Sequence, residues 1–92
     1  MRITAELSLY PMHEQFLPRI ETFIRSLHSA PGLEVTVNQM STQLRGELEV
    51  VTRAVERALA SSFEVGGPQV LVAKFLNADL PILEAPSLDP PG

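Results

Sequence analysis

The sequence lacks cysteine and tryptophan, and aromatic residues make up only 5% of its 92 residues. Without cysteine there is no disulfide framework, no thiolate metal site and no thiol nucleophile. No apolar run approaches the roughly 20 residues that a bilayer-spanning helix needs. The first residues alternate in polarity, whereas a signal peptide has a continuous apolar stretch. We therefore expect a cytoplasmic protein that does not insert into a membrane.

Positive charge is also scarce, because seven Lys and Arg residues face 11 Asp and Glu residues, for a net charge of −4. The basic residues are scattered, and an acidic chain repels phosphate backbones, so we expect no nucleic-acid partner. A chain of this length with 45% hydrophobic residues has enough apolar surface for one core. The sequence predicts one globular domain.

The first half of the chain predicts a strand, a helix and a second strand. Residues 2–10 alternate between apolar and polar side chains, which is typical of a strand with one buried face. Pro11 ends this strand, because proline cannot donate to a β-ladder. An amphipathic helix follows, and we place its start near Glu14 because Pro18 is tolerated only in a first turn. After turn residues 29–32, residues 33–38 alternate again and predict a second strand.

The second half repeats this order. A short third strand is expected over residues 42–45, and Gly46 is predicted to open a second helix with Glu47 and Glu49 in its first turn. Residues 66–68 are Gly-Gly-Pro and end the helix. Residues 70–76 are apolar with little alternation, which favours a central strand covered on both faces. A proline-rich tail follows, with Pro81, Pro86, Pro90 and Pro91.

Two β-α-β units in tandem predict an α+β fold of the ferredoxin-like kind, β-α-β-β-α-β, with two helices on one face of a four-stranded antiparallel sheet. Residues 1–79 form this domain and residues 80–92 the tail. The sheet face without helices is expected to be polar and to be wet or packed on a second sheet in an oligomer. Its expected residues are Thr4, Glu6, Ser8, Thr36, Asn38, Gln43 and Arg45.

Three short motifs occur in order along the chain: Ser8-Leu9-Tyr10-Pro11, Met40-Ser41-Thr42 and Lys74-Phe75-Leu76-Asn77-Ala78. In these motifs the chain resembles the YkoF-like thiamine/hydroxymethylpyrimidine-binding family over roughly residues 2–79. The resemblance implies the ferredoxin-like fold and a ligand site at the Ser41-Thr42 motif. Well-studied members hold two such units in one chain and pair them through their sheets. A single unit therefore implies a homodimer or homotetramer.

Seven residues are candidates for ligand binding, each with a plainer alternative. Ser41 and Thr42 both donate and accept hydrogen bonds, or only cap a turn. The ring of Tyr10 can stack on a ligand, or pack on the tail or a partner subunit. The Asn77 amide suits a pyrimidine edge, or forms a turn. The remaining candidates are Glu6, Ser8 and Met40. For Glu6 an ion pair with Arg45 or Lys74 is favoured over contact with a ligand. Met40 either covers a ligand as a lid or fills a gap in the core.

No pattern of catalytic residues is present. His13 and His28 have no second ligand at metal-binding spacing, and there is no Ser-His-Asp set or phosphate loop. We expect no metal and no cofactor, and a non-catalytic domain that binds thiamine or hydroxymethylpyrimidine in salvage, transport or sensing. One alternative is an assembly module that uses its sheet face and apolar tail only to build oligomers. Another is a small dimeric enzyme with Glu6 or His13 as acid or base.

Overall fold

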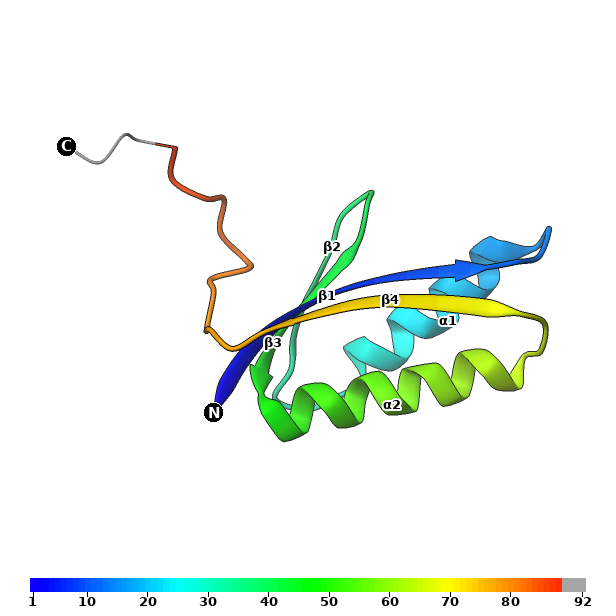
Figure 1. Ribbon diagram of the computed structural model, residues 1–92, viewed down its shortest axis with the longest axis horizontal. Helices are drawn as coiled ribbons and strands as arrows, with labels where there is room; N and C mark the ends of the chain where they lie inside the picture. The colour runs from blue at the N-terminus through cyan, green and yellow to red at the C-terminus, as the bar shows by residue number, and fades with distance from the viewer. Residues whose placement is uncertain (89–92) are drawn as a thin grey trace.

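The computed structural model describes residues 1–88 and confirms the ferredoxin-like α+β fold. All strand pairs are antiparallel, in the sheet order β2-β3-β1-β4. Both helices cover the same face of the sheet (Figure 1). Pro90 and Pro91 of the predicted tail lie outside the described residues. The elements are β1 (Arg2–Pro11), α1 (Phe16–His28), β2 (Glu34–Val37), β3 (Thr42–Glu47), α2 (Leu48–Glu64) and β4 (Gln69–Leu76).

The core lies between the helices and the central strands. The apolar side chains of β1 point to the helices, as its alternation predicts, and none of the four is more than 8% exposed. Helix α1 contributes Phe23 and Leu27, and α2 contributes Val51 and Ala58 among others. Burying a residue of this size removes enough apolar surface to stabilise the fold by about 1.5–3 kcal/mol. The sheet face away from the helices is called the open face below.

Helix α1 begins at Phe16, two residues after the expected start. Pro18 is therefore its third residue and lies in the first turn, where a missing N–H costs nothing. The Arg19 side chain donates to the Gly66 carbonyl at 3.3 Å and to the Gln15 carbonyl at 3.0 Å. It thus links the start of α1 to the turn that leads into β4.

The start of the second helix differs from the sequence prediction. Gly46 and Glu47 belong to β3, and α2 begins at Leu48. Gly46 pairs with Ile3 of β1, and a Cβ at this position would lie 3.1 Å from the Gly32 carbonyl oxygen. The glycine is therefore needed for a close approach of the Gly32 turn to the strand, and not as a helix start.

The position of β4 is a second correction. The strand is at the edge of the sheet beside β1 and is not a covered central strand. Val70, Val72 and Leu76 are 45%, 47% and 45% exposed on the open face, and Phe75 is 52% exposed on the helix side. The chain crosses over through α2 from β3 to the far side of β1, which makes β4 the outermost strand. Periodicity does not distinguish a central apolar strand from an apolar edge strand.

A candidate ligand groove beside helix α1

A groove of about 590 Å³ lies between α1 and the end of the sheet where β1 stops and the β2–β3 hairpin turns. This volume is within the range of small-molecule sites. Most of its surface is apolar, and Phe23 at 2% exposure belongs to the core beneath it. Helix α1 supplies Phe16, Ile20, Phe23 and Ile24, and β1 with the residues that follow supplies Leu7, Leu9, Pro11 and Met12.

Thr42 brings a hydroxyl into this apolar surrounding. It is the first residue of β3, it faces the helices as Leu44 does, and it is only 5% exposed. Its side chain has no hydrogen bond within residues 1–88, and no fully buried side-chain polar atom there lacks a partner. The hydroxyl oxygen is therefore accessible, and the groove is the open space that Thr42 lines. It can donate to and accept from a ligand.

Asn38 at the start of the hairpin loop supplies a second polar group. Its side-chain oxygen accepts from the backbone N–H groups of Met40 at 3.0 Å and Ser41 at 2.9 Å, which fixes the loop. Its amide nitrogen makes no hydrogen bond within the described chain, and Asn38 lines the groove. Two N–H donors are therefore left for a ligand.

Ser41 points to the other side of the sheet from Thr42, because side chains alternate along a strand. Its hydroxyl donates to Glu6 Oε2 at 3.2 Å, and Glu6 Oε1 lies 3.4 Å from Lys74 Nζ. The alternative predicted for Glu6, an ion pair across strands, is thus present. Ser8 is on the same face and donates to the Met40 carbonyl at 3.4 Å. These contacts support the hairpin loop from the open face.

The other candidates are divided between the two ends of the sheet. Tyr10 and Met40 line the groove and are 53% and 86% exposed. Asn77 follows β4 at the opposite end, because Leu76 pairs with Thr4 whereas Val70 pairs with Tyr10. Six residues of extended strand span about 20 Å. The structure therefore brings five of the predicted residues to or behind the hairpin loop, with Glu6 next to them, and leaves Asn77 apart.

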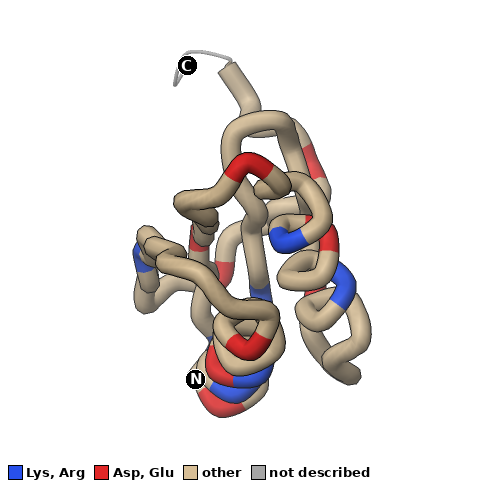
Figure 2. Tube along the Cα trace, turned by 90° about the vertical axis from the view of Figure 1, so that its right-hand side faces the viewer, with Lys and Arg blue, Asp and Glu red and all other residues tan. Residues whose placement is uncertain are grey.

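The groove carries no charge, since none of the described residues that line it is Asp, Glu, Lys, Arg or His. Figure 2 shows acidic and basic residues interspersed along the chain without a large region of one sign. Within residues 1–88 no group of three His, Asp or Glu side chains is placed to hold a metal ion. No helix in this part of the chain has both the length and the hydrophobicity to cross a bilayer.

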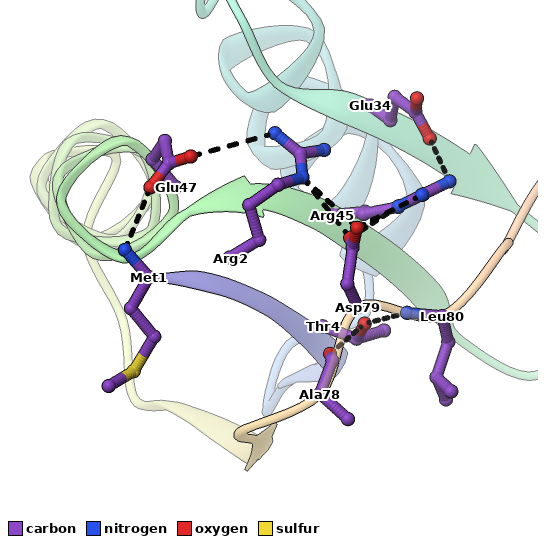
Figure 3. A network of polar contacts seen from close by, with 9 residues as sticks. All are labelled: Met1, Arg2, Thr4, Glu34, Arg45, Glu47, Ala78, Asp79 and Leu80. Atoms are coloured by element: carbon purple, nitrogen blue, oxygen red, sulfur yellow. Dashed lines mark hydrogen bonds and ion pairs between the residues drawn. The ribbon is translucent and has the colours of Figure 1, made fainter.

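At the other end of the sheet a set of contacts fastens the tail, here called the C-terminal clamp (Arg2, Thr4, Arg45 and Asp79; Figure 3). Arg45 donates to Asp79 at 2.6 and 3.2 Å, and Arg2 donates to the same carboxylate at 3.2 Å. The hydrogen bond from Arg45 lowers the pKa of Asp79 below its usual value, and Arg2 adds to this effect. The clamp therefore holds a carboxylate in its charged form.

Thr4 completes the clamp from within the sheet. Its hydroxyl donates to the Ala78 carbonyl at 2.7 Å and accepts from Leu80 N–H at 2.9 Å, and the residue is 7% exposed. Beyond this point the tail leaves the body of the protein (Figure 1). The clamp thus determines where the tail crosses the open face.

Sequence reasoning missed the groove residues of α1 and the clamp. The apolar residues of α1 cover more than one helical stripe, since Leu17 and Ile24 lie beside the stripe of Phe23 and Leu27. That width is a signal of apolar surface in excess of what the core uses. The sequence gives a weaker indication of the clamp, because Arg2, Arg45 and Asp79 are up to 77 residues apart and meet only in the folded chain.

No protein-family model matches the sequence, and a search of curated proteins finds no significant match. Solved structures do match, and three of them with low sequence identity are described next.

A structure of a domain of unknown function, DUF77, from Bacillus cereus is 22% identical with a TM-score of 0.75, over 86% of this chain and 78% of that chain. Protein SP2199 from Streptococcus pneumoniae is 18% identical with a TM-score of 0.79, over 87% and 90%. A "putative thiamine biosynthesis/salvage protein", TM0486 from Thermotoga maritima, is 19% identical with a TM-score of 0.75, over 85% of both chains. At these identities the similarity establishes a shared fold.

Proposed function

We propose that this domain binds thiamine or its hydroxymethylpyrimidine moiety in the groove beside α1 and does not catalyse a reaction. The observation that carries the proposal is an apolar groove of ligand size in which the Thr42 hydroxyl and the Asn38 amide nitrogen have no hydrogen-bond partner within residues 1–88. The Thermotoga maritima protein, which is described as a thiamine biosynthesis/salvage protein and shares the fold, supports the ligand class.

The charges around the groove favour the pyrimidine half of thiamine as the part that is enclosed. An aminopyrimidine is a flat, neutral ring whose edge both donates and accepts, which matches Thr42 and Asn38. The thiazolium half is a cation and needs a carboxylate or an electron-rich ring. Glu6 is a carboxylate beside the hairpin loop, but it is on the open face and is paired with Lys74. Phe16, which lines the groove and is 47% exposed, offers a ring to the cation.

Isothermal titration calorimetry of the purified protein tests the proposal with thiamine and with hydroxymethylpyrimidine as ligands. We expect both to bind, and Thr42→Val to weaken binding about tenfold by removing one hydrogen bond at constant shape. Thr36→Val is the matched control, because Thr36 is in β2 and does not line the groove. The absence of heat for both ligands at millimolar concentration would refute the proposal.

An assembly module is the second candidate, and the exposed apolar side chains of β4 favour it. It predicts that the Ser41→Ala and Thr42→Ala changes leave the oligomeric state and every binding property unaltered. The enzyme alternative assigned acid or base roles to Glu6 and His13. His13 does not line the groove, and its Nδ1 accepts from Gln15 N–H at 3.0 Å. An activity that survives both Glu6→Gln and His13→Ala would remove those roles.

A further inference from the structure

All the sulfur of this chain is in methionine, because the sequence has three methionines and no cysteine. Methionine usually fills gaps in a core. Here Met1, Met12 and Met40 are 77%, 62% and 86% exposed, and the buried core of residues 1–88 is made of Ile, Ala, Leu, Phe and Val. The packing of the domain therefore gives no reason for these three side chains.

Two of the three methionines line the groove beside α1. Met12 follows the end of β1, and its N–H donates to the Pro68 carbonyl at 2.9 Å. Met40 lies in the loop between β2 and β3, where its N–H donates to the Asn38 side-chain oxygen at 3.0 Å and its carbonyl accepts from Ser8 Oγ at 3.4 Å. Hydrogen bonds thus fix both backbones at the groove and leave both thioethers accessible to solvent.

Met1 is the reference for these two side chains. Its ammonium group lies 3.0 Å from Glu47 Oε2, at the clamp end of the sheet, and it does not line the groove. Its exposure lies between those of Met12 and Met40. Any property that exposure alone gives to a methionine is therefore shared by Met1, whereas an effect on the groove is not.

A thioether suits the wall of a site that receives a flat ring. Its three rotatable bonds let it adapt to the ligand, and the polarisable sulfur makes favourable contacts with aromatic rings. Ile20 and Phe23 adapt less, because both pack on the core from α1. Met12 and Met40 are thus an adaptable part of the groove.

We propose that Met12 and Met40 are oxidation sites, and that their conversion to sulfoxides by hydrogen peroxide lowers the affinity of the groove for its ligand. In each reaction one oxygen atom passes from the peroxide to the sulfur, the sulfur loses two electrons, and water is released. The identity of the ligand rests on the proposed function. The modification itself does not, because it requires only exposed thioethers.

The sulfoxide acts on the groove through its polarity. Its S–O group is a hydrogen-bond acceptor on a side chain that was apolar. At Met40 the new acceptor is two residues from both Asn38 and Thr42, whose free N–H and O–H groups are the donors offered to a ligand. At Met12 the oxygen has to stay in water, which draws the side chain away from the apolar wall. Both changes take contacts from the ligand.

Exposure also makes the change reversible. Methionine sulfoxide reductases return the sulfur to the thioether with two thiols as the reductant, which leave as a disulfide while the oxygen leaves as water. The chain has no cysteine, so oxidation of a protein thiol cannot contribute to the effect.

Peroxide treatment followed by titration tests the inference. The excess peroxide is removed with catalase, and peptide mass spectrometry follows the gain of one oxygen at Met1, Met12 and Met40. We expect the Kd for thiamine, measured by isothermal titration calorimetry, to rise at least about tenfold once Met12 and Met40 are oxidised. Treatment with reductases for both sulfoxide epimers should restore the original Kd. An unchanged Kd at full oxidation of the two groove methionines would overturn the proposal.

The Met12→Leu/Met40→Leu variant is the matched comparison, because leucine is similar in volume to methionine and has no sulfur to oxidise. Peroxide still oxidises Met1 in this variant, and it should leave the Kd of the variant where it was before treatment. Equal rises in Kd for the variant and the unmodified protein would refute the role of the groove methionines. Where the variant binds too weakly to measure, recovery of the unmodified protein after reduction decides the question.

A failure of the proposed function is recognised separately. If the untreated protein gives no heat with thiamine or hydroxymethylpyrimidine, the same comparison is made with N-phenyl-1-naphthylamine, a neutral dye that fluoresces in apolar sites. A dye signal that falls on oxidation of Met12 and Met40 and returns on reduction supports the oxidation sites without the proposed ligand. A dye signal that is absent from the start, or that oxidation leaves unchanged, would overturn the inference.

Discussion

The two ends of β1 have opposite character. At its start, Arg2 and Thr4 belong to the C-terminal clamp, where both side chains bind residues of the tail. At its end, Leu9 and Tyr10 border an apolar groove in which the Thr42 hydroxyl has no hydrogen-bond partner among the described residues. One strand thus connects a structural site whose side chains are hydrogen-bonded with a groove in which a buried hydroxyl is free to bind a ligand. Unpaired polar groups in an apolar setting are the features that a ligand can use.

The largest expected effect is at the groove end, at the base of the site. Phe23→Ala removes a ring that is 2% exposed and leaves a cavity, so we expect the free energy of unfolding to fall by about 3–5 kcal/mol in urea titrations. Phe16→Ala is the matched control, because that ring is 47% exposed, and its loss should cost about 1 kcal/mol or less. Equal losses in the two variants would show that the groove has no rigid base.

The next effect is at the clamp end. Thr4→Val leaves the Ala78 carbonyl and the Leu80 N–H without their partner, and we expect a loss of about 1–3 kcal/mol in the same titrations. Thr36→Val is again the control, since Thr36 is on the same sheet face and its side chain makes no hydrogen bond within the described residues. No difference between the two variants would mean that Thr4 does not hold the tail.

The charge of Asp79 gives a smaller effect that depends on pH. The pKa of Asp79 is lowered in the folded protein by its hydrogen bond with Arg45. The stability that the charged Asp79 carboxylate gives to the clamp is therefore complete above its ordinary pKa of about 3.9, and it is lost as the pH falls through the lower folded value. We expect the backbone of residues 80–88 to become mobile in this acidic range, as measured by heteronuclear NOE. Asp79→Asn should have the same effect at neutral pH, and Glu84→Gln should have none. A tail that stays ordered in Asp79→Asn would contradict this role.

The smallest effect is expected at the exposed border of the clamp. Glu47 contacts the N-terminal ammonium at 3.0 Å and Arg2 at 3.9 Å, but its side chain is 54% exposed. We expect Glu47→Gln to change the free energy of unfolding by less than about 1 kcal/mol, because solvent screens such pairs. A larger loss would extend the clamp to the chain terminus and sharpen the contrast between the two ends of β1.

Much of the fold was predictable from local patterns, and parts of the site were not. The alternation of β1 and the three-to-four spacing in α1 gave the correct element types, because periodicity reflects which side of an element is buried. The motif that was predicted to bind a ligand, Ser41 and Thr42, lies in the structure at the hairpin beside the groove. The opposite directions of these two side chains depend on the register of β3 beside β1, and the position of Asn77 depends on the direction of β4.

The sequence by itself determined that this chain forms two β-α-β units around one apolar core. The tertiary structure decided that β4 is an edge strand, that Gly46 lies within β3 against the Gly32 turn, and that Asp79 meets Arg2 and Arg45. The reason is physical: a periodic pattern reports only the polarity of the surroundings of each residue. Contacts between distant residues depend on strand order and register, which follow from how the whole chain packs.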